Sequence, residues 1–238
     1  MIIIPDIHGR IFWKKPVEEN LGKEYILFLG DYLDPYYYED VPPEEVFPRF
    51  MEILALKREH PDDMMLLLGN HDLHYVNGAL QGGRYDYLHG VRNKKAFSDN
   101  ARLFQLTYEI VIHGRRYLFS HAGIHAGWIQ KYKAYLGGAE PEEIGRTLNE
   151  YWWNNGHWPR LFTILKDIPY SRFGNCRYGS PVWADIEDWQ DDPEELPGIY
   201  QIFGHSQQET DPVIGRHFAC LDCRKAFRLT DDGIIDKL

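Results

Sequence analysis

Residues 64–72 read MMLLLGNHD, an apolar run that ends abruptly in glycine, asparagine, histidine and aspartate. Continuous apolar runs of this length are typical of strands that are buried on both faces of a sheet. Four other runs also end in polar clusters, and these runs are Ile2–Ile4, Tyr25–Leu29, Tyr117–Phe119 and Ile199–Phe203. The repetition predicts several buried strands whose carboxyl ends all carry polar residues.

The segment between the second and third runs has the spacing of a helix. Val46, Phe50 and Ile53 recur at helical intervals within Pro43–His60, and Pro48 lies near the expected start. An alternation of strand, helix and strand predicts an α/β sandwich, in which ligands bind beyond the carboxyl ends of the strands. All five polar clusters would lie at that edge, which favours a single site.

Two antiparallel ribbons and one insertion complete the predicted organisation. Tyr108–Ile112 and Arg116–Phe119 favour a hairpin, and Phe218–Leu221 followed by Ala226–Leu229 favours a second ribbon. Residues 131–168 are rich in aromatic side chains and break the strand pattern, so we expect a helical cap inserted there. The length of the chain predicts one domain, residues 1–238, that includes this cap.

The composition excludes several classes of partner. Hydrophobic residues make up 44% and charged residues 26% of the 238 residues, as in ordinary globular proteins. The net charge is 26 − 36 = −10, and no run of Lys or Arg forms a basic stripe. A nucleic-acid duplex or an anionic membrane is therefore not an expected partner. An acidic protein can still bind phosphate where metal ions supply local positive charge.

The cysteines and the first residues indicate a reducing compartment. The chain has three cysteines, Cys176, Cys220 and Cys223, and the opening run Ile2–Ile4 lacks the basic lead of a secretory signal. No stretch reaches the roughly eighteen apolar residues that a membrane-spanning helix needs. We therefore expect a cytoplasmic protein.

The first two polar clusters contain residue types that bind divalent metals. Asp6 and His8 stand at positions i and i+2, so in an extended segment both side chains would point the same way. Asp31 follows Gly30, and the two oxygens of a carboxylate can bridge two cations. Asp34 would face the same cavity if residues 31–34 were helical, because it lies about one turn further on.

The other three clusters add an amide oxygen and three imidazoles. Asn70 offers a neutral oxygen ligand, and His71 offers an acid of the type that works near neutral pH. His121 and His205 each lie at a strand end beside a small residue. Any one of these residues also fits an ordinary role, such as a turn-forming asparagine or a hydrogen-bonded histidine. Their joint occurrence and order carry the hypothesis of a metal site.

Taken in order, five short motifs resemble the calcineurin-like metallophosphoesterase superfamily. They are Asp6-x-His8-Gly9, Gly30-Asp31-x-x-Asp34, Gly69-Asn70-His71-Asp72, His121-Ala122-Gly123 and Gly204-His205. The second motif is most similar to the phosphoprotein phosphatase branch, including its bacterial members. The motifs run from residue 6 to about residue 206, which is most of the chain.

The resemblance implies a four-layer α-β-β-α sandwich that holds two divalent ions. It implies six metal ligands, which are Asp6, His8, Asp31, Asn70, His121 and His205. The first ion would bind Asp6, His8 and His205, the second would bind Asn70 and His121, and Asp31 would bridge the two. His71 would be the general acid and Asp34 its orienting partner. Manganese is the favoured metal, with iron, zinc or cobalt as alternatives.

Two arginines that are usual in the phosphoprotein phosphatase branch are missing. The branch has one directly after the second motif and one directly before the third, where this chain has Pro35 and Leu68. Both family residues bind the phosphate group of the substrate. We therefore expect Arg10, Arg172 or Arg177 to bind the phosphate here.

These features predict a phosphatase that hydrolyses a phosphomonoester by metal-bound hydroxide, with His71 as the acid. The substrate is a phosphorylated small molecule or a phosphoprotein. A dinucleoside-polyphosphate hydrolase of the diadenosine tetraphosphate type is the alternative enzyme, because the aromatic cap would suit an adenine base. A non-catalytic metal-binding scaffold is a further alternative, although neither the acid nor any ligand is missing.

Overall fold

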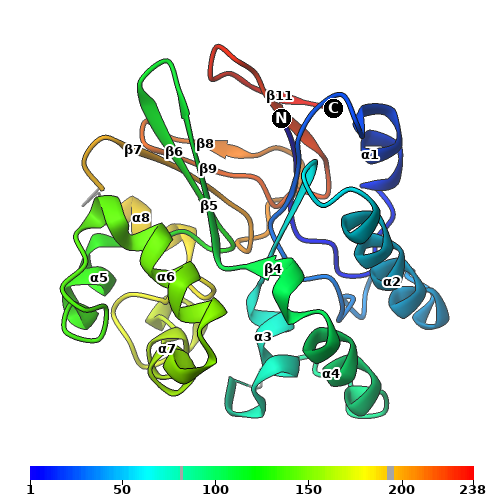
Figure 1. The fold of residues 1–238 in the computed structure, drawn as a ribbon, viewed down its shortest axis with the longest axis horizontal. Coiled ribbons are helices and arrows are strands. Elements are labelled where there is room, and N and C mark those ends of the chain that lie inside the picture. The colour runs from blue at the N-terminus through cyan, green and yellow to red at the C-terminus, as the bar shows by residue number, and fades with distance from the viewer. Residues whose placement is uncertain (81–82, 192–195) are drawn as a thin grey trace. The chain divides into compact units, whose positions relative to one another are not determined.

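The computed structural model describes residues 1–80, 83–191 and 196–238 and has a mixed α/β fold with two sheets (Figure 1). The chain divides into two compact units. Unit 1 consists of residues 1–104 and 224–238, and unit 2 consists of residues 105–223. The predicted α/β class is confirmed, and each unit is built around one sheet.

The sheet of unit 1 is centred on three parallel strands, as the apolar runs predicted. Strands β1 (Ile2–Ile4), β2 (Ile26–Phe28) and β3 (Met64–Leu67) lie side by side in register. Strands β10 (Phe227–Leu229) and β11 (Ile235–Lys237) extend the sheet antiparallel beyond β1. The order is β11-β10-β1-β2-β3-β4, and β4 covers Phe104–Gln105 where the two units meet in sequence.

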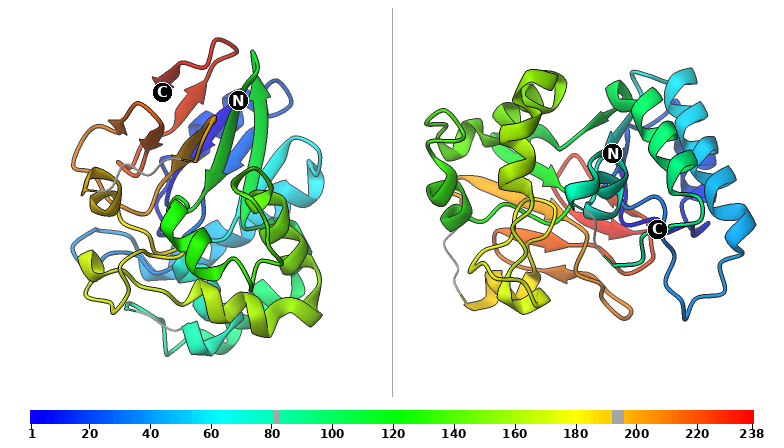
Figure 2. Two further views of the ribbon diagram at one scale, coloured as in Figure 1. Left: turned by 90° about the vertical axis from the view of Figure 1, so that its left-hand side faces the viewer. Right: turned by 90° about the horizontal axis from the view of Figure 1, so that it is seen from below.

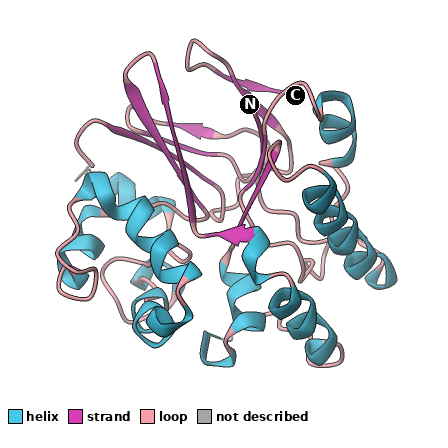
Figure 3. Cartoon of the chain, viewed as in Figure 1, coloured by secondary structure: helices cyan, strands magenta, loops and turns pink. Residues whose placement is uncertain are grey.

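Four α-helices belong to unit 1 among the described residues (Figure 3). They are α1 (Lys14–Asn20), α2 (Pro43–Glu59), α3 (Asn70–Val76) and α4 (Gly90–Asp99). Short 3₁₀ turns follow at Gly78–Leu80 and Ala101–Leu103. Helix α2 occupies almost the whole predicted segment, and Pro48 lies inside it rather than delaying its start. Its acidic first turn and basic last turn both suit the helix dipole.

An aromatic cluster inside unit 1 anchors the loop that follows β2. The rings of Tyr32, Phe50, Phe97 and Phe104 pack together, with the centroids of Phe50 and Phe97 4.8 Å apart. All four side chains are buried, and each burial contributes about 1.5–3 kcal/mol. The Tyr32 hydroxyl donates to the carbonyl oxygen of Leu67 at 2.9 Å. The ends of β2 and β3 are therefore tied together below the surface.

The sheet of unit 2 begins with the predicted hairpin, which Figure 2 shows from two further directions. Strands β5 (Thr107–Ile112) and β6 (Arg115–Ser120) pair antiparallel. Strands β7 (Ile199–Phe203) and β9 (Phe218–Cys220) continue the sheet parallel to β6, and β8 (Val213–Ile214) closes it. The order is β5-β6-β7-β9-β8.

The helices of unit 2 lie in sequence between β6 and β7. They are α5 (Ala126–Tyr132), α6 (Ile144–Trp153), α7 (Trp158–Leu165) and α8 (Ile186–Asp191), with 3₁₀ turns at Pro141–Glu143, Asn155–His157 and Tyr170–Arg172. The predicted cap segment, residues 131–168, contains α6 and α7. Within the described residues, none of the helices combines the length and apolar character that crossing a bilayer requires.

One predicted pairing is wrong. Phe218–Leu221 and Ala226–Leu229 were expected to form a ribbon, but β9 pairs with β7 and β8 in unit 2. Strand β10 pairs instead with β1 and β11 in unit 1. Two neighbouring apolar runs indicate strands but not their partners, which depend on which buried edge each run can reach.

A buried asparagine joins helix α6 to the start of β5. The Asn149 side-chain oxygen accepts from the backbone amides of Leu106 and Thr107 at 3.0 and 3.1 Å. Its side-chain nitrogen donates to the Thr107 carbonyl and to the Gln105 side chain, both at 2.9 Å. This one side chain satisfies four polar groups within unit 2, so its loss would leave buried backbone groups without partners.

We predict that Asn149→Ala lowers the free energy of unfolding by about 2–4 kcal/mol, because buried amides lose their acceptor. Urea denaturation followed by circular dichroism measures this. Arg146→Ala is the matched control, since Arg146 is exposed on the same helix and should change stability by less than about 0.5 kcal/mol. Equal midpoints for the two variants would contradict the prediction.

Candidate functional site

The loops that follow β1, β2 and β3 carry the first candidate residues. Because the three strands are parallel, their carboxyl ends lie at one edge of the unit 1 sheet. Asp6 and His8 follow β1, Asp31 follows β2, and Asn70 begins helix α3 directly after β3. All four residues are buried. Unit 1 therefore brings four of the six predicted ligands to one sheet edge.

Backbone contacts hold the first two loops against each other. The amides of His8 and Gly9 donate to the carbonyl oxygens of Asp31 and Tyr32 at 2.6 and 3.0 Å. His8 and Asp31 both adopt left-handed backbone angles, with φ of 44° and 54°. Residues other than glycine rarely adopt this region, and those that do cluster at functional sites. The extended segment expected at Asp6–His8 is therefore wrong, because His8 lies in a turn.

A glycine is required where the second loop meets the third. Gly30 has φ of 113°, and a Cβ atom placed on it would lie 2.5 Å from the backbone nitrogen of Gly69. Neither the conformation nor the space admits a side chain. This close approach allows the loops of β2 and β3 to share hydrogen-bond partners.

Asp72 is the partner that these two loops share. Its carboxylate accepts from the amides of Gly69, Asp31 and Tyr32 at 2.8, 2.7 and 3.0 Å. Burial and the neighbouring Asp31 carboxylate raise the pKa of Asp72, and the three amides oppose that rise. The sequence motif named Asp72 without a role. In the structure it orients Asp31, the residue predicted to bridge the two ions.

The ring of His8 has the tautomer that a metal ligand needs. Its Nδ1 lies 3.0 Å from the carbonyl oxygen of Leu33, which can only accept, so the proton is on Nδ1. Burial lowers the pKa of His8 well below its usual value, against the pull of Asp31, so the ring is neutral. The lone pair of Nε2 then faces Asp31 Oδ2 at 3.4 Å. Histidines that bind metals typically donate their other nitrogen in this way.

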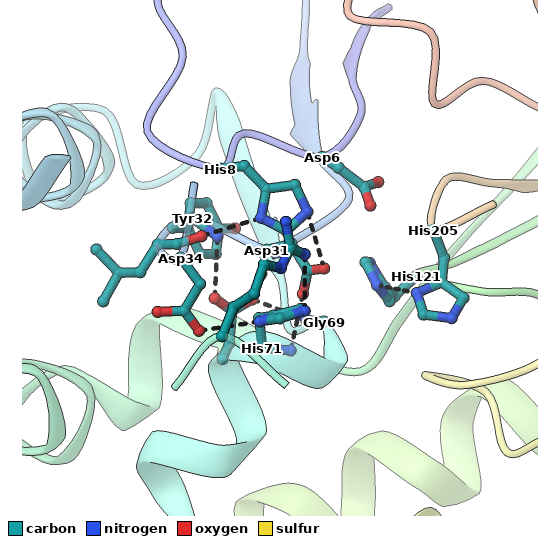
Figure 4. A network of polar contacts seen from close by, with 12 residues as sticks. Asp6, His8, Asp31, Tyr32, Asp34, Gly69, His71, His121 and His205 are labelled. Atoms are coloured by element: carbon teal, nitrogen blue, oxygen red, sulfur yellow. Dashed lines mark hydrogen bonds and ion pairs between the residues drawn. The ribbon is translucent and has the colours of Figure 1, made fainter. Parts of the chain in front are cut away.

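Asp34 and His71 form a buried pair beside these ligands (Figure 4). His71 Nδ1 lies 2.9 Å from Asp34 Oδ2, and His74 Nε2 lies 2.7 Å from the same oxygen. Tyr75 donates its hydroxyl to the other oxygen of Asp34. Burial raises the pKa of Asp34, but His71 and His74 lower it further, so the carboxylate stays ionised below its usual range.

The structure corrects the reason for placing Asp34 near His71. Residues 31–34 are not helical, and Asp34 has a left-handed φ of 58°. The helix that matters is α3, which carries His71, His74 and Tyr75 at one-turn spacing. The backbone amide of His71 also donates to Asp31 Oδ1 at 3.0 Å. The predicted acid is therefore tied both to its orienting carboxylate and to the predicted bridging ligand.

Arg84 is a residue that the sequence analysis missed. Its Nη2 lies 2.9 Å from His71 Nε2. A guanidinium only donates, so Nε2 accepts and the proton of His71 lies on Nδ1, toward Asp34. The Arg84 guanidinium also lies over the Tyr36 ring, 3.5 Å from its centroid. Arg84 follows no motif, and its spacing in the sequence contains no signal that would have found it.

Unit 2 brings together the two remaining predicted ligands. His121 follows β6 and His205 follows β7, and the amide of Gly204 donates to the His121 carbonyl at 2.8 Å. His121 Nε2 and His205 Nδ1 lie 3.1 Å apart, and both rings are buried. Gln201 holds the loop after His121 through two hydrogen bonds to the backbone of Ile124.

Comparison with known proteins agrees with this geometry, since residues 2–209 match the calcineurin-like phosphoesterase family. The chain belongs to that family. No significant match was found among curated proteins. The bacterial and eukaryotic neighbours that follow are similar to this phosphoesterase in structure.

The first neighbour is a cold-active protein-tyrosine phosphatase of a psychrophilic Shewanella species, with 15% identity and a TM-score of 0.58. That likeness covers 100% of the phosphoesterase and 79% of the neighbour. The second is a protein serine/threonine phosphatase from Saccharomyces cerevisiae with similarity to human phosphatase PP5, at 13% identity and a TM-score of 0.52. It is covered over 78% of its length and also matches 100% of this chain. At these identities the likeness shows the fold.

The donor set of the phosphoesterase fits divalent cations. Asp6 and Asp31 are buried carboxylates, which need a positive partner when they are ionised. His8 adds a neutral imidazole beside Asp31, and Asn70 adds an amide oxygen. Oxygen and imidazole donors together suit first-row divalent metals, and the donor types do not choose among them.

The three predicted substrate arginines lie in different surroundings. Arg10 forms two hydrogen bonds with Glu39, at 2.6 and 2.8 Å. Arg172 lies 2.6 Å from Asp185 and donates to the carbonyl of His205 at 3.2 Å. Arg177 is exposed and lies over the ring of Tyr178. A role for each in substrate binding stays a prediction.

We predict that Asp72→Ala lowers the free energy of unfolding by about 2–4 kcal/mol and weakens metal binding about 10–100-fold. The first effect arises because three buried amides lose their acceptor, and the second because Asp31 loses its support. Urea denaturation and manganese titration measure the two. Asp99→Ala, a change at an exposed position on α4, is the control and should alter neither quantity. Wild-type behaviour of Asp72→Ala would refute the role.

Proposed function

We propose that this phosphoesterase is a two-metal phosphatase that hydrolyses phosphomonoesters, with His71 as the general acid. The observation that carries the proposal is the hydrogen-bonded series Asp31–His71–Asp34. The His71 amide donates to Asp31 at 3.0 Å, and its ring lies 2.9 Å from Asp34. A proton donor is thereby held in hydrogen-bond contact with the predicted bridging ligand, in the order that the family resemblance implies.

We further propose that six side chains hold the two ions, and they are Asp6, His8, Asp31, Asn70, His121 and His205. When bound, the ions supply positive charge to the phosphate oxygens and activate the attacking water. Asp6 and Asp31 contribute two negative charges against four from two divalent ions. The excess matches the charge of a phosphate dianion, so the acidic composition of the chain does not oppose its substrate.

His71 would donate the proton that the leaving oxygen requires. For this step the proton must reside on Nε2, and Asp34 stabilises the doubly protonated ring through Nδ1. His74 and Tyr75 hold Asp34 in place from the same helix. The acid is therefore oriented by a carboxylate that itself has two supports, which fixes the direction in which His71 presents its proton.

Both structural neighbours are phosphatases of phosphorylated proteins by their names. Protein substrates therefore belong among the candidates for this chain, beside small phosphomonoesters. The dinucleoside-polyphosphate alternative rested on the aromatic cap. Trp152 is buried and stacks on Trp158 with centroids 5.2 Å apart, so these ring faces pack inside unit 2. Phosphomonoester hydrolysis is the function with more support.

We predict that His71→Asn keeps its metal ions and loses about 10²–10⁴ in turnover, because only the proton donor is removed. Metal analysis and steady-state hydrolysis of O-phosphoserine measure the two properties. His60→Asn, at a partly exposed histidine beyond α2, is the matched control and should behave as wild type. Full turnover in His71→Asn would refute the acid role.

Asp31→Asn should lose metal as well as turnover, because a neutral amide cannot bridge two cations. Chelation of the wild-type protein should abolish hydrolysis, and added manganese should restore it. The same treatment should fail to restore Asp31→Asn, while Asp99→Asn on the exposed face of α4 should recover fully. Hydrolysis that survives chelation with no bound metal would exclude a metal-dependent mechanism.

A further inference from the structure

A pocket of about 610 Å³ opens in unit 1 beside the His71 acid. Its walls come from the segment after β2 and from the segment between α3 and α4. Four tyrosines line it together with Arg84 and Asp34, and these tyrosines are Tyr36, Tyr37, Tyr85 and Tyr87. Pockets of this size commonly hold a small ligand or one anchoring side chain. The proposed function does not yet use this space.

The tyrosine wall, which consists of Tyr36, Tyr37, Tyr85 and Tyr87, begins close to His71. The ring of His74 lies 5.3 Å from the ring of His71, and the ring of Tyr85 lies 5.0 Å from that of His74. Tyr85 in turn stacks on Tyr75 and meets Tyr87 edge-on, both at 4.9 Å. Tyr37 and Tyr87 are largely exposed at the entrance. Ring contacts therefore run from His71 through the buried His74 to the tyrosines at the pocket entrance.

Arg84 lines the pocket and contacts His71. Its Nη2 donates to His71 Nε2, while its Nη1 is buried and has no hydrogen-bond partner among the described residues. Stacking on Tyr36 fixes the plane of the guanidinium, and Tyr36 meets the His8 ring edge-on at 4.9 Å. An unused donor at this place suits an oxygen of a phosphate ester.

The acidic side chains of the pocket are already occupied. Glu39 is paired with Arg10, and Asp86 accepts from the ring and the amide of His89 at 2.8 and 2.9 Å. Asp34 is held by the histidines of α3. The lining that remains for a ligand includes the four tyrosine rings and the Arg84 donor, which suits an aromatic group attached to phosphate.

We propose that this pocket binds the aromatic leaving group of a phenolic phosphomonoester, with Arg84 binding an oxygen of the same ester. The proposal rests on the proposed function, because His71 defines where the leaving oxygen lies. In a phenolic ester the ring is bonded directly to that oxygen, so it would enter the wall next to His71. A nucleotide places a sugar there instead, and a serine ester places only a methylene group.

The substrate must displace Arg84 Nη2 from His71, because Nε2 is the ring atom that would face the leaving oxygen. In the free protein that nitrogen accepts from Arg84. An ester oxygen near Nη1 and Nη2 would accept from both donors and leave Nε2 free to face the leaving oxygen. Arg84 is thus assigned to substrate binding at a position that compensates for Pro35 and Leu68, where the related phosphatases have arginine.

The test compares kcat/KM for phenyl phosphate and O-phosphoserine in the manganese-loaded protein and its variants. The phenyl-to-serine ratio of kcat/KM in each variant is divided by the same ratio in the wild-type protein, so the different intrinsic reactivities of the two esters cancel. We expect Tyr85→Leu to lower the phenyl-to-serine ratio about tenfold, and the exposed Tyr87→Leu to lower it about threefold, through lost ring contacts. Tyr25→Leu, at the opposite end of β2, is the matched control and should leave the ratio unchanged.

Arg84→Gln should instead lower kcat/KM for both esters about equally, since it binds the group that they share. Unchanged ratios in both Tyr85→Leu and Tyr87→Leu would overturn the proposal. An equal loss of kcat/KM for adenosine 5′-monophosphate and for phenyl phosphate in Tyr85→Leu would also overturn the proposal, because the tyrosines would then bind a nucleoside. A phosphotyrosine peptide that outperforms free O-phosphotyrosine would identify a protein as the source of the phenolic group, and the reverse would identify a small molecule.

A binding measurement separates this proposal from the proposed function. Phenylphosphonate and methylphosphonate are not hydrolysed, so calorimetric titration of the manganese-loaded protein reports on the pocket without turnover. We expect phenylphosphonate to bind about tenfold more tightly, and Tyr85→Leu to remove that preference. Absence of turnover on every ester would refute the phosphatase proposal alone. Equal affinity for the two phosphonates would refute the aromatic pocket alone.

Discussion

The carboxylate of Asp72 is the interaction on which the unit 1 site depends. It accepts hydrogen bonds from three amides that belong to the ends of two different strands. The loop after β2 holds Asp31 in a strained left-handed conformation, and the hydrogen bonds to Asp72 offset that cost. A buried carboxyl group that accepts from three backbone amides therefore sets the position of the candidate bridging ligand. A residue that is not a predicted ligand therefore determines where a predicted ligand lies.

The strands and the polar clusters at their ends could be predicted because one feature of the sequence, an apolar run with a polar end, indicates both. An apolar run such as Ile199–Phe203 has to be buried, and its polar end has to leave the sheet at the carboxyl edge. The family likewise followed from five motifs in order, and the match over residues 2–209 agrees. What failed was partner choice: Phe218–Cys220 joins one sheet and Phe227–Leu229 the other, which alternation alone cannot decide.

The contacts around His71 could be predicted only in part. Its pairing with Asp34 was expected from the family, but the expected helical turn at residues 31–34 is absent and α3 supplies the geometry. Arg84 could not be predicted because it reaches His71 from a loop of no regular spacing, with a left-handed φ of 62°. Contacts that are made by irregular backbone leave no periodic trace in a sequence. Residues of this kind emerge only when coordinates are available.

Helix α3 is short, yet four of its residues serve two purposes: one anchors the loops, and three contact Asp34. Asp72 anchors two loops, while His71, His74 and Tyr75 all converge on Asp34. Six of these seven residues are buried, so opening the helix would expose the Asp72 carboxyl group and the ring of Tyr75 to water. The anchor of the two loops and the predicted acid would therefore be lost together, because one helix carries both.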